Sequence, residues 1–368
     1  MTLASVLLAA LGFMVLIVLH EAGHFAAAKW VGMRVERFAL FFPPLVWRKQ
    51  VGETEYALGT IPLGGYVRIS GMNPSEDLPA EVRDRAYHAQ PPWKRMVVIA
   101  AGPLVNLLLA FILLFAYLAF IGPRDPARAS GTVDAIEKGY PAATALKPGD
   151  RLISVDGVTG DPGDLSEAIS EHECAGTPTD GCRAATPARL VIERNGERRP
   201  LELRPMYDAD AQPEGRTRLG FAYLNDGPRD PYPLGQAFTQ TGDRLWLLTK
   251  ETVKLPARLF DAEKRKEISG LVGSYEYTRQ TILDDVADVL AIMALISLSL
   301  AIVNLFPFLP LDGGHIFWAI VEKVRRKPVP FAVMERAGVI GFLLVIGLFF
   351  IGLTNDIDRL SGEGFEVR

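Results

Sequence analysis

The segment His20-Glu21-Ala22-Gly23-His24 has the residue types and the spacing of a metal-dependent hydrolytic site. In a helix, residues four apart share one face, so both imidazoles can reach one zinc ion. The glutamate projects beside them and can take a proton from a water that the metal activates. These polar side chains follow an apolar stretch, where they are costly unless they bind something. We therefore predict a metal site, rather than two structural histidines, with Glu21 as the base.

A catalytic zinc ion normally has three protein ligands, so a third ligand is needed beside His20 and His24. Asp312 directly follows a long apolar stretch that we expect to cross a membrane in the same direction as the helix of His20. Its carboxylate would then reach a similar depth, whereas His315 lies one step further out. The alternative role for Asp312 is to cap the helix that follows it.

Two prolines, Pro307 and Pro310, precede Asp312 and predict that the helix is broken there. Non-helical backbone at membrane depth is tolerated where it is buried in protein or lines a wet cavity. A cavity of this kind would suit a reaction that consumes water.

Apolar residues are concentrated in four stretches that carry no charge, although the 368-residue chain is only 49% hydrophobic, with a mean hydropathy of +0.17. A membrane-spanning helix needs about 20 such residues. The first stretch could be a signal peptide, but no basic residue precedes Lys29. We predict four transmembrane helices, and the net charge of −4 disfavours a nucleic-acid partner. The stretches are 1–19, 96–123, 289–311 and 337–355.

The loops between these stretches differ in charge. Residues 29–95 and 312–336 are net basic, whereas residues 124–288 are net acidic. The positive-inside rule places the basic loops in the cytoplasm. The predicted metal site then lies towards the cytoplasmic side, and residues 124–288 lie outside.

Three motifs together resemble the site-2 protease family of intramembrane zinc metalloproteases. They are HEAGH at His20–His24, AGPLVN at Ala101–Asn106 and NLFPFLPLDGG at Asn304–Gly314. The bacterial branch with a PDZ module between the second and third spans is the most similar. The resemblance implies that His20, His24 and Asp312 bind Zn²⁺ and that Glu21 is the general base.

The resemblance also implies substrate-binding residues. Asn304 is similar to an asparagine that holds the substrate backbone. Gly64, Gly65 and Tyr66 resemble a membrane-dipping β-hairpin that adds a strand to an unwound substrate, although an ordinary membrane-surface hairpin would have similar residues. The segment Ser269–Ser274 departs from the family pattern, with Leu271 where a proline is usual.

The segment Gly131–Gly157 has short β-branched stretches separated by Gly, Pro and Asp, and it resembles a circularly permuted bacterial PDZ domain. A PDZ domain binds a peptide or protein terminus by strand addition, and we place the clamping loop near Ser130–Val133. Cys174 and Cys182 would form a disulfide if this region is extracytoplasmic, or remain free thiols. Within residues 233–288 we expect an amphipathic helix, either at the membrane surface or packed on the PDZ domain.

The predicted fold class is an α-helical polytopic membrane protein with an inserted extracytoplasmic PDZ (α+β) domain. Its predicted parts are a first membrane core (1–122), the PDZ domain (124–225), an amphipathic connector (226–288), a second membrane core (289–355) and a tail (356–368).

The predicted activity is that of a zinc endopeptidase of the bacterial inner membrane. It would cleave single-span membrane proteins, such as anti-sigma factors or remnant signal peptides, after an upstream protease has trimmed their external domain. A divalent-cation transporter and a PDZ scaffold with a structural metal are the rival interpretations. Glu21 argues against both, because neither function needs a base beside the ligands.

Overall fold

The computed structural model describes residues 3–73, 76–209, 211, 215–258, 273, 285–327 and 329–361. These residues form two compact units. The helical unit comprises Met1–Ala119 and Pro233–Arg368, and the inserted unit comprises Phe120–Tyr232. The inserted unit extends a few residues beyond both ends of the predicted PDZ domain. Of the segment Ser269–Ser274, only Gly273 belongs to the described residues.

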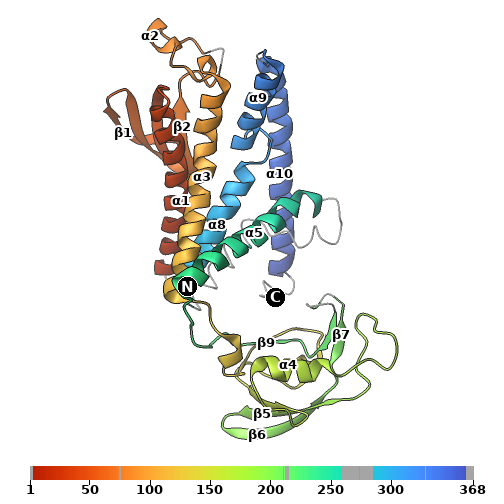
Figure 1. Ribbon diagram of the computed structural model, residues 1–368. Helices are drawn as coiled ribbons and strands as arrows, with labels where there is room; N and C mark the ends of the chain where they lie inside the picture. Colours follow the sequence, from red (N-terminus) through yellow and green to blue (C-terminus); the bar gives the residue numbers. More distant parts are fainter. Residues whose placement is uncertain are drawn as a thin grey trace. The chain divides into compact units, whose positions relative to one another are not determined.

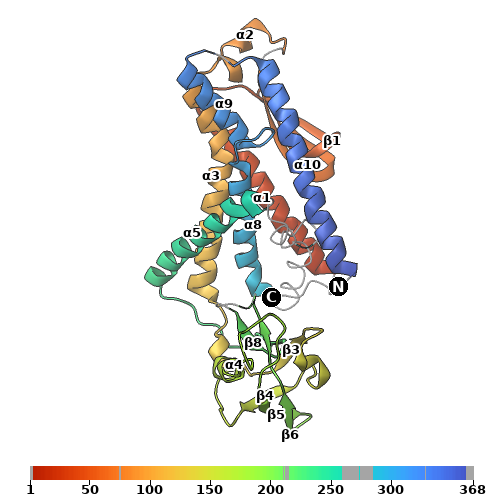
Figure 2. The same ribbon diagram turned by 90° about the vertical axis from the view of Figure 1, so that its right-hand side faces the viewer.

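Helices build most of the helical unit (Figures 1 and 2). Helix α3 packs against α1, α8 and α9. Helix α3 begins with a proline at its first position, where the missing N–H costs nothing. The helices are α1 (Leu3–Trp30), α3 (Pro92–Ala116, continued by a π-helical turn Tyr117–Ile121), α8 (Val289–Asn304), α9 (Asp312–Arg325) and α10 (Phe331–Ser361).

Three stretches of the described helices are long and apolar enough to cross a membrane: Leu11–Trp30, Pro92–Ile121 and Ala332–Asp358. The chain is thus a helical protein with several candidate membrane spans. Helix α8 has 16 residues and ends at Asn304, so the predicted helix over 289–311 is shorter than expected. The remainder of that apolar stretch is non-helical up to Asp312, and a fourth span through this region stays a prediction.

A bent β-hairpin packs beside α1. Its strands are β1 (Val35–Val51) and β2 (Thr54–Ile69), and they pair antiparallel with several register shifts. Leu40 is paired with Leu58 on one side and with Gly65 on the other. Residues 35–40 therefore lie between the segments 54–58 and 65–69, and the segment 65–69 is an outer part of this small sheet. The short helix α2 (Ala80–Arg83) follows the hairpin.

Helix α5 (Leu234–Arg258) belongs to the helical unit and contacts α3 and α8 (Figures 1 and 2). The rings of Phe111 on α3 and Phe238 on α5 are 5.2 Å apart, edge to face. Trp246 is exposed, and the ammonium group of Lys250 lies 5.1 Å from its ring. Helix α5 thus packs on two apolar helices, and its placement at the membrane surface stays a prediction.

The inserted unit combines short sheets with one helix. A three-stranded sheet has the order β4-β5-β6, and the pairs β3-β9 and β7-β8 form two further ladders. Helix α4 (Pro162–Ser170) begins with a capping box between Asp161 and Asp164. The strands are β3 (Val133–Ile136), β4 (Arg151–Val155), β5 (Ala188–Arg194), β6 (Glu197–Leu203), β7 (Met206–Asp208), β8 (Arg216–Arg218) and β9 (Phe221–Tyr223).

An apolar core holds these sheets and α4 together. It contains Val155 of β4, Leu165 of α4, and Leu190 and Ile192 of β5, which are all buried. Cys174 and Cys182 form a disulfide with a Cα–Cα distance of 6.2 Å, which closes the loop between them. The structure thus has the disulfide rather than two free thiols.

Candidate metal centre

Three side chains that could bind a metal meet inside the helical unit. His20 and His24 lie one turn apart on α1, and Asp312 is the first residue of α9. The two Nε2 atoms are 3.2 Å apart, and each lies 3.3 Å from Oδ2 of Asp312. Both histidines are 7% exposed. His315 is not a member of this group among the described residues.

This triangle of atoms has the size that a zinc site requires. A tetrahedral ion with bonds of about 2.0 Å separates its ligand atoms by about 3.3 Å. Oδ2 of Asp312 is buried and has no hydrogen-bond partner among the described residues. Two imidazole nitrogens and one carboxylate oxygen are a donor set that catalytic zinc uses, with the fourth position left for water. The residues therefore fit a zinc ion.

Each imidazole also contacts α3 through its second ring nitrogen. Nδ1 of His24 donates a hydrogen bond to the backbone oxygen of Val98 at 2.8 Å. A carbonyl oxygen can only accept, so Nδ1 carries the proton, and Nε2 of the neutral ring keeps its lone pair for a metal. Nδ1 of His20 lies 3.1 Å from the side-chain amide of Asn106.

Small and polar residues of α3 make room for these rings. Val98, Gly102 and Asn106 are spaced by four residues and so share one face of α3. A Cβ on Gly102 would overlap Nε2 of His24 and lie 2.6 Å from Cε1 of that ring. A Cβ on Gly23 of α1 would lie 2.7 Å from a backbone oxygen of α3. The two glycines therefore allow the close approach that brings α3 to the histidines.

Glu21 lies beside the outer segment of the hairpin. A Cβ on Gly65 would lie 3.1 Å from Cγ of Glu21. The Glu21 carboxylate also lies near the backbone of Val67. Extended backbone of β2 therefore passes directly beside the predicted base.

The turn before α9 places Asp312. Leu311 occupies the N-cap position of α9, and no side-chain capping bond is formed there, so Asp312 does not have the capping role considered as an alternative. A Cβ on Gly313 would overlap the backbone of Leu305, and one on Gly314 would lie 2.5 Å from the backbone nitrogen of Leu309. The two glycines after Asp312 therefore let α9 start directly against the non-helical segment.

The other residues predicted to bind substrate lie outside the triangle of metal-binding atoms. Asn304 is the last residue of α8 and is half-buried. Tyr66 of β2 stacks on Phe42 with ring centroids 5.8 Å apart, and its hydroxyl accepts a hydrogen bond from Arg37. Gly64 has φ +153°, a conformation that favours glycine.

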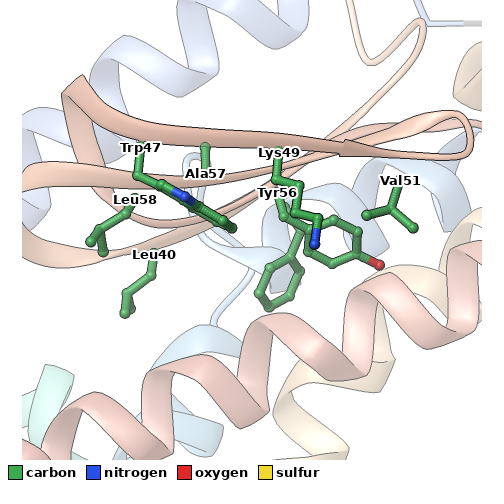
Figure 3. Close-up of a pocket in the computed structure, with 8 residues that line it drawn as sticks. Leu40, Trp47, Lys49, Val51, Tyr56, Ala57 and Leu58 are labelled. Carbon is green, nitrogen blue, oxygen red and sulfur yellow. The ribbon is translucent and has the colours of Figure 1, made fainter.

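An apolar hollow lies on one face of the hairpin (Figure 3). Leu40, Trp47 and Leu58 line one part of it, and Tyr56 and Lys49 line another. Trp47 is 51% exposed there. The hairpin thus offers an exposed apolar surface.

Ion pairs hold the turn of this hairpin to the end of α1. The Glu53 carboxylate accepts hydrogen bonds from Arg85 at 2.8 Å and from Lys29 at 2.6 Å. These two cations, Arg85 foremost, lower the pKa of Glu53 to about 2. Glu53 is therefore ionised throughout the physiological pH range, and the hairpin is tied to the helix that carries the histidines.

The contacts that α3 makes with the histidines were not predicted from the sequence. Gly102 and Asn106 belong to the AGPLVN motif, but their partners on α1 could not be assigned from it. The usable signal was their four-residue spacing, which equals that of His20 and His24.

Comparisons with known proteins match nearly the whole chain. The model of peptidase family M50 matches residues 8–348. A protein of Nostoc sp. is 29% identical over 98% of this chain and 97% of its own length. A protein of Brucella suis is 30% identical over 93% of this chain and 92% of its own length, and one of Rhizobium meliloti is 31% identical over 94% of each. All three carry the provisional name of zinc metalloprotease.

Proposed function

The chain belongs to peptidase family M50, the site-2 protease family of zinc metallopeptidases, and from this premise we propose that it cleaves transmembrane segments of single-span membrane proteins. Its substrates would be anti-sigma factors or remnant signal peptides whose external domain an upstream protease has already removed. The candidate membrane spans and the apolar hairpin beside the metal centre support a substrate that lies in the bilayer.

In this proposal His20, His24 and Asp312 hold the zinc ion. The bound ion would act as a Lewis acid that polarises a peptide carbonyl and lets water lose a proton near neutral pH. The supporting observation is the near-equilateral triangle of 3.2–3.3 Å between the three ligand atoms.

Glu21 is the general base. Its position directly after His20 on α1 puts the carboxylate next to the ligand atoms without making it one of them. It accepts the proton of the attacking water and then returns it to the leaving amine of the cleaved peptide bond.

The substrate has to be extended before it can be cleaved, because a helix hides its carbonyls in hydrogen bonds. We place the unwound segment against the outer part of β2, at Gly64, Gly65 and Tyr66, where it adds a strand. Gly65 lies next to Glu21, so a strand paired there would pass the base. Asn304, at the end of α8, would bind the substrate backbone from the other side of the cleaved bond.

The inserted unit is a PDZ domain in this proposal. It binds a peptide or protein terminus outside the membrane and excludes substrates that still carry a bulky external domain. The protein would be a multi-pass component of the bacterial inner membrane, with the metal centre towards the cytoplasm. The mixture of short sheets with one helix supports an α+β module of this kind.

The proposal is tested with the purified full-length chain in detergent and a labelled single-span substrate without its external domain. We expect the wild-type chain to cleave it, and both a zinc chelator and the substitution Glu21→Gln to abolish cleavage. Normal cleavage by Glu21→Gln would refute the role of Glu21. Absence of cleavage across several such substrates, with zinc bound, would refute the proteolytic function.

A further inference from the structure

The two histidines of the metal centre are held in different ways. Nδ1 of His24 faces a backbone carbonyl, which fixes the proton on that nitrogen. Nδ1 of His20 faces a side-chain amide, whose oxygen can accept and whose nitrogen can donate. The state of His20 therefore depends on which end of the Asn106 amide lies against it.

Metal binding requires one of the two orientations. Nε2 of His20 points into the triangle, 3.2 Å from Nε2 of His24 and 3.3 Å from Oδ2 of Asp312. An imidazole nitrogen that binds a metal carries no proton, so Nδ1 must carry it. The amide oxygen of Asn106 must then be the atom that faces Nδ1.

Nothing in the described surroundings holds the amide in the opposite orientation. The amide nitrogen faces His20, and Oδ1 is buried without a hydrogen-bond partner among the described residues. The two ends of a carboxamide have nearly the same shape, and the hydrogen-bond network decides between them. Rotation of the amide by 180° brings Oδ1 to Nδ1 of His20. Oδ1 loses no hydrogen bond in this rotation, because it has none among the described residues beforehand.

Asn106 is also fixed in place. It is fully buried on α3, and its backbone oxygen accepts a hydrogen bond from Ser297 of α8 at 2.8 Å. The residue thus joins three helices at the level of the metal centre. In the described part of the chain, its side chain is hydrogen-bonded to His20.

We propose that Asn106 is a positioning residue of the metal centre. Its side-chain oxygen accepts the Nδ1 proton of His20 and thereby keeps Nε2 free to bind the metal. The inference rests on the zinc site proposed above. Asn106 touches neither water nor substrate in this role and acts through His20.

The test measures zinc affinity of the purified full-length chain by competition with a chromophoric chelator. Loss of an outer partner of a metal-binding histidine typically weakens metal binding by about 10–100-fold, and we expect this for Asn106→Leu. Asn106→Asp should bind zinc within about threefold of the wild type or more tightly, because a carboxylate can only accept and is a common partner of metal-binding histidines. If Asn106 had only a structural role, Asn106→Asp should bind zinc more weakly than the wild type, because a buried charge would disturb the packing.

Ser297→Ala is the matched control, because it removes the buried hydrogen bond to the backbone of Asn106 and leaves the side chain intact. We expect its zinc affinity to stay within about threefold of the wild type. Wild-type affinity in folded Asn106→Leu, or weak binding in folded Asn106→Asp, would overturn the proposal. If Asn106→Leu does not fold, the zinc affinity of Asn106→Asp alone tests the proposal. Failure of the wild-type chain to bind zinc would instead refute the proposed function.

Discussion

The substitution Gly102→Ala places a methyl group against the metal centre. Gly102 lies on the face of α3 that packs on α1, and its added Cβ would overlap Nε2 of His24. The same carbon would lie 2.6 Å from Cε1 of the ring. Nδ1 of His24 is held at 2.8 Å by the oxygen of Val98, so the ring cannot simply rotate away without losing that bond.

The size of the effect follows from these distances. Carbon atoms in contact are about 3.5–4.0 Å apart, so the ring or the helix must move by about 0.9 Å. Zinc–nitrogen distances vary by only about 0.2 Å between sites, and the shift is therefore more than four times that tolerance. We expect zinc affinity to fall by about 100-fold, the upper end of the losses caused by disturbed partners of metal ligands.

The assay compares the purified Gly102→Ala and wild-type chains for zinc content after dialysis and for substrate cleavage. Gly347→Ala is the matched control, since Gly347 also lies in a long apolar helix, α10, but a Cβ there would meet nothing within 4 Å. We expect this control to keep its zinc and its activity. A folded Gly102→Ala chain with wild-type zinc affinity and activity would refute the packing of α3 against His24.

Two further predictions concern the inserted unit. Arg194 holds the pKa of the buried Asp150 carboxyl below its usual value through two hydrogen bonds of 2.6 and 2.7 Å. The pair should therefore stabilise this unit by roughly 1–3 kcal/mol above about pH 4. This stabilisation should be lost as the pH falls further and the carboxylate is protonated. Asp150→Asn should remove that pH dependence, and the lost stability should appear as faster amide hydrogen exchange in β5 of the variant. Equal exchange in the variant and the wild-type chain at pH 6 would contradict this prediction. Reducing the Cys174–Cys182 disulfide, which closes a loop of sequence separation 8, should destabilise the unit by about 2–3 kcal/mol, measured by the same exchange with Cys174→Ser as a second form. Unchanged exchange after reduction would show that the loop is held by other contacts.

The spacing of residues in the sequence predicts much of the metal centre. Residues four apart on a helix share a face, so the HExxH pattern alone puts His20 and His24 together. That Asp312 reaches the two histidines could be inferred, because the apolar stretch before it runs in the same direction as α1. The structure places Oδ2 of Asp312 at 3.3 Å from both rings, although the helix before it ends eight residues earlier, at Asn304.

Contacts between helices could not be inferred in the same way. The partners of Gly102 and Asn106 depend on how α3 is rotated against α1, and hydrophobic periodicity is weak in helices that are apolar on every side. The position of Gly65 beside Glu21 likewise depends on the pairing of 35–40 with two separate parts of β2. In the inserted unit, the turn at Asn195-Gly196 is a strong hairpin signal that would have located β5 and β6.

The most direct test is X-ray absorption at the zinc edge of the zinc-loaded full-length chain, compared with Asp312→Ala and Glu21→Gln. We expect one zinc ion with two imidazole ligands and oxygen ligands in the wild-type chain, and the same spectrum for Glu21→Gln, because Glu21 is not a ligand. Asp312→Ala should lose an oxygen ligand and bind zinc more weakly. An unchanged zinc environment in Asp312→Ala, or a changed one in Glu21→Gln, would contradict the assignment of the three ligands and the base.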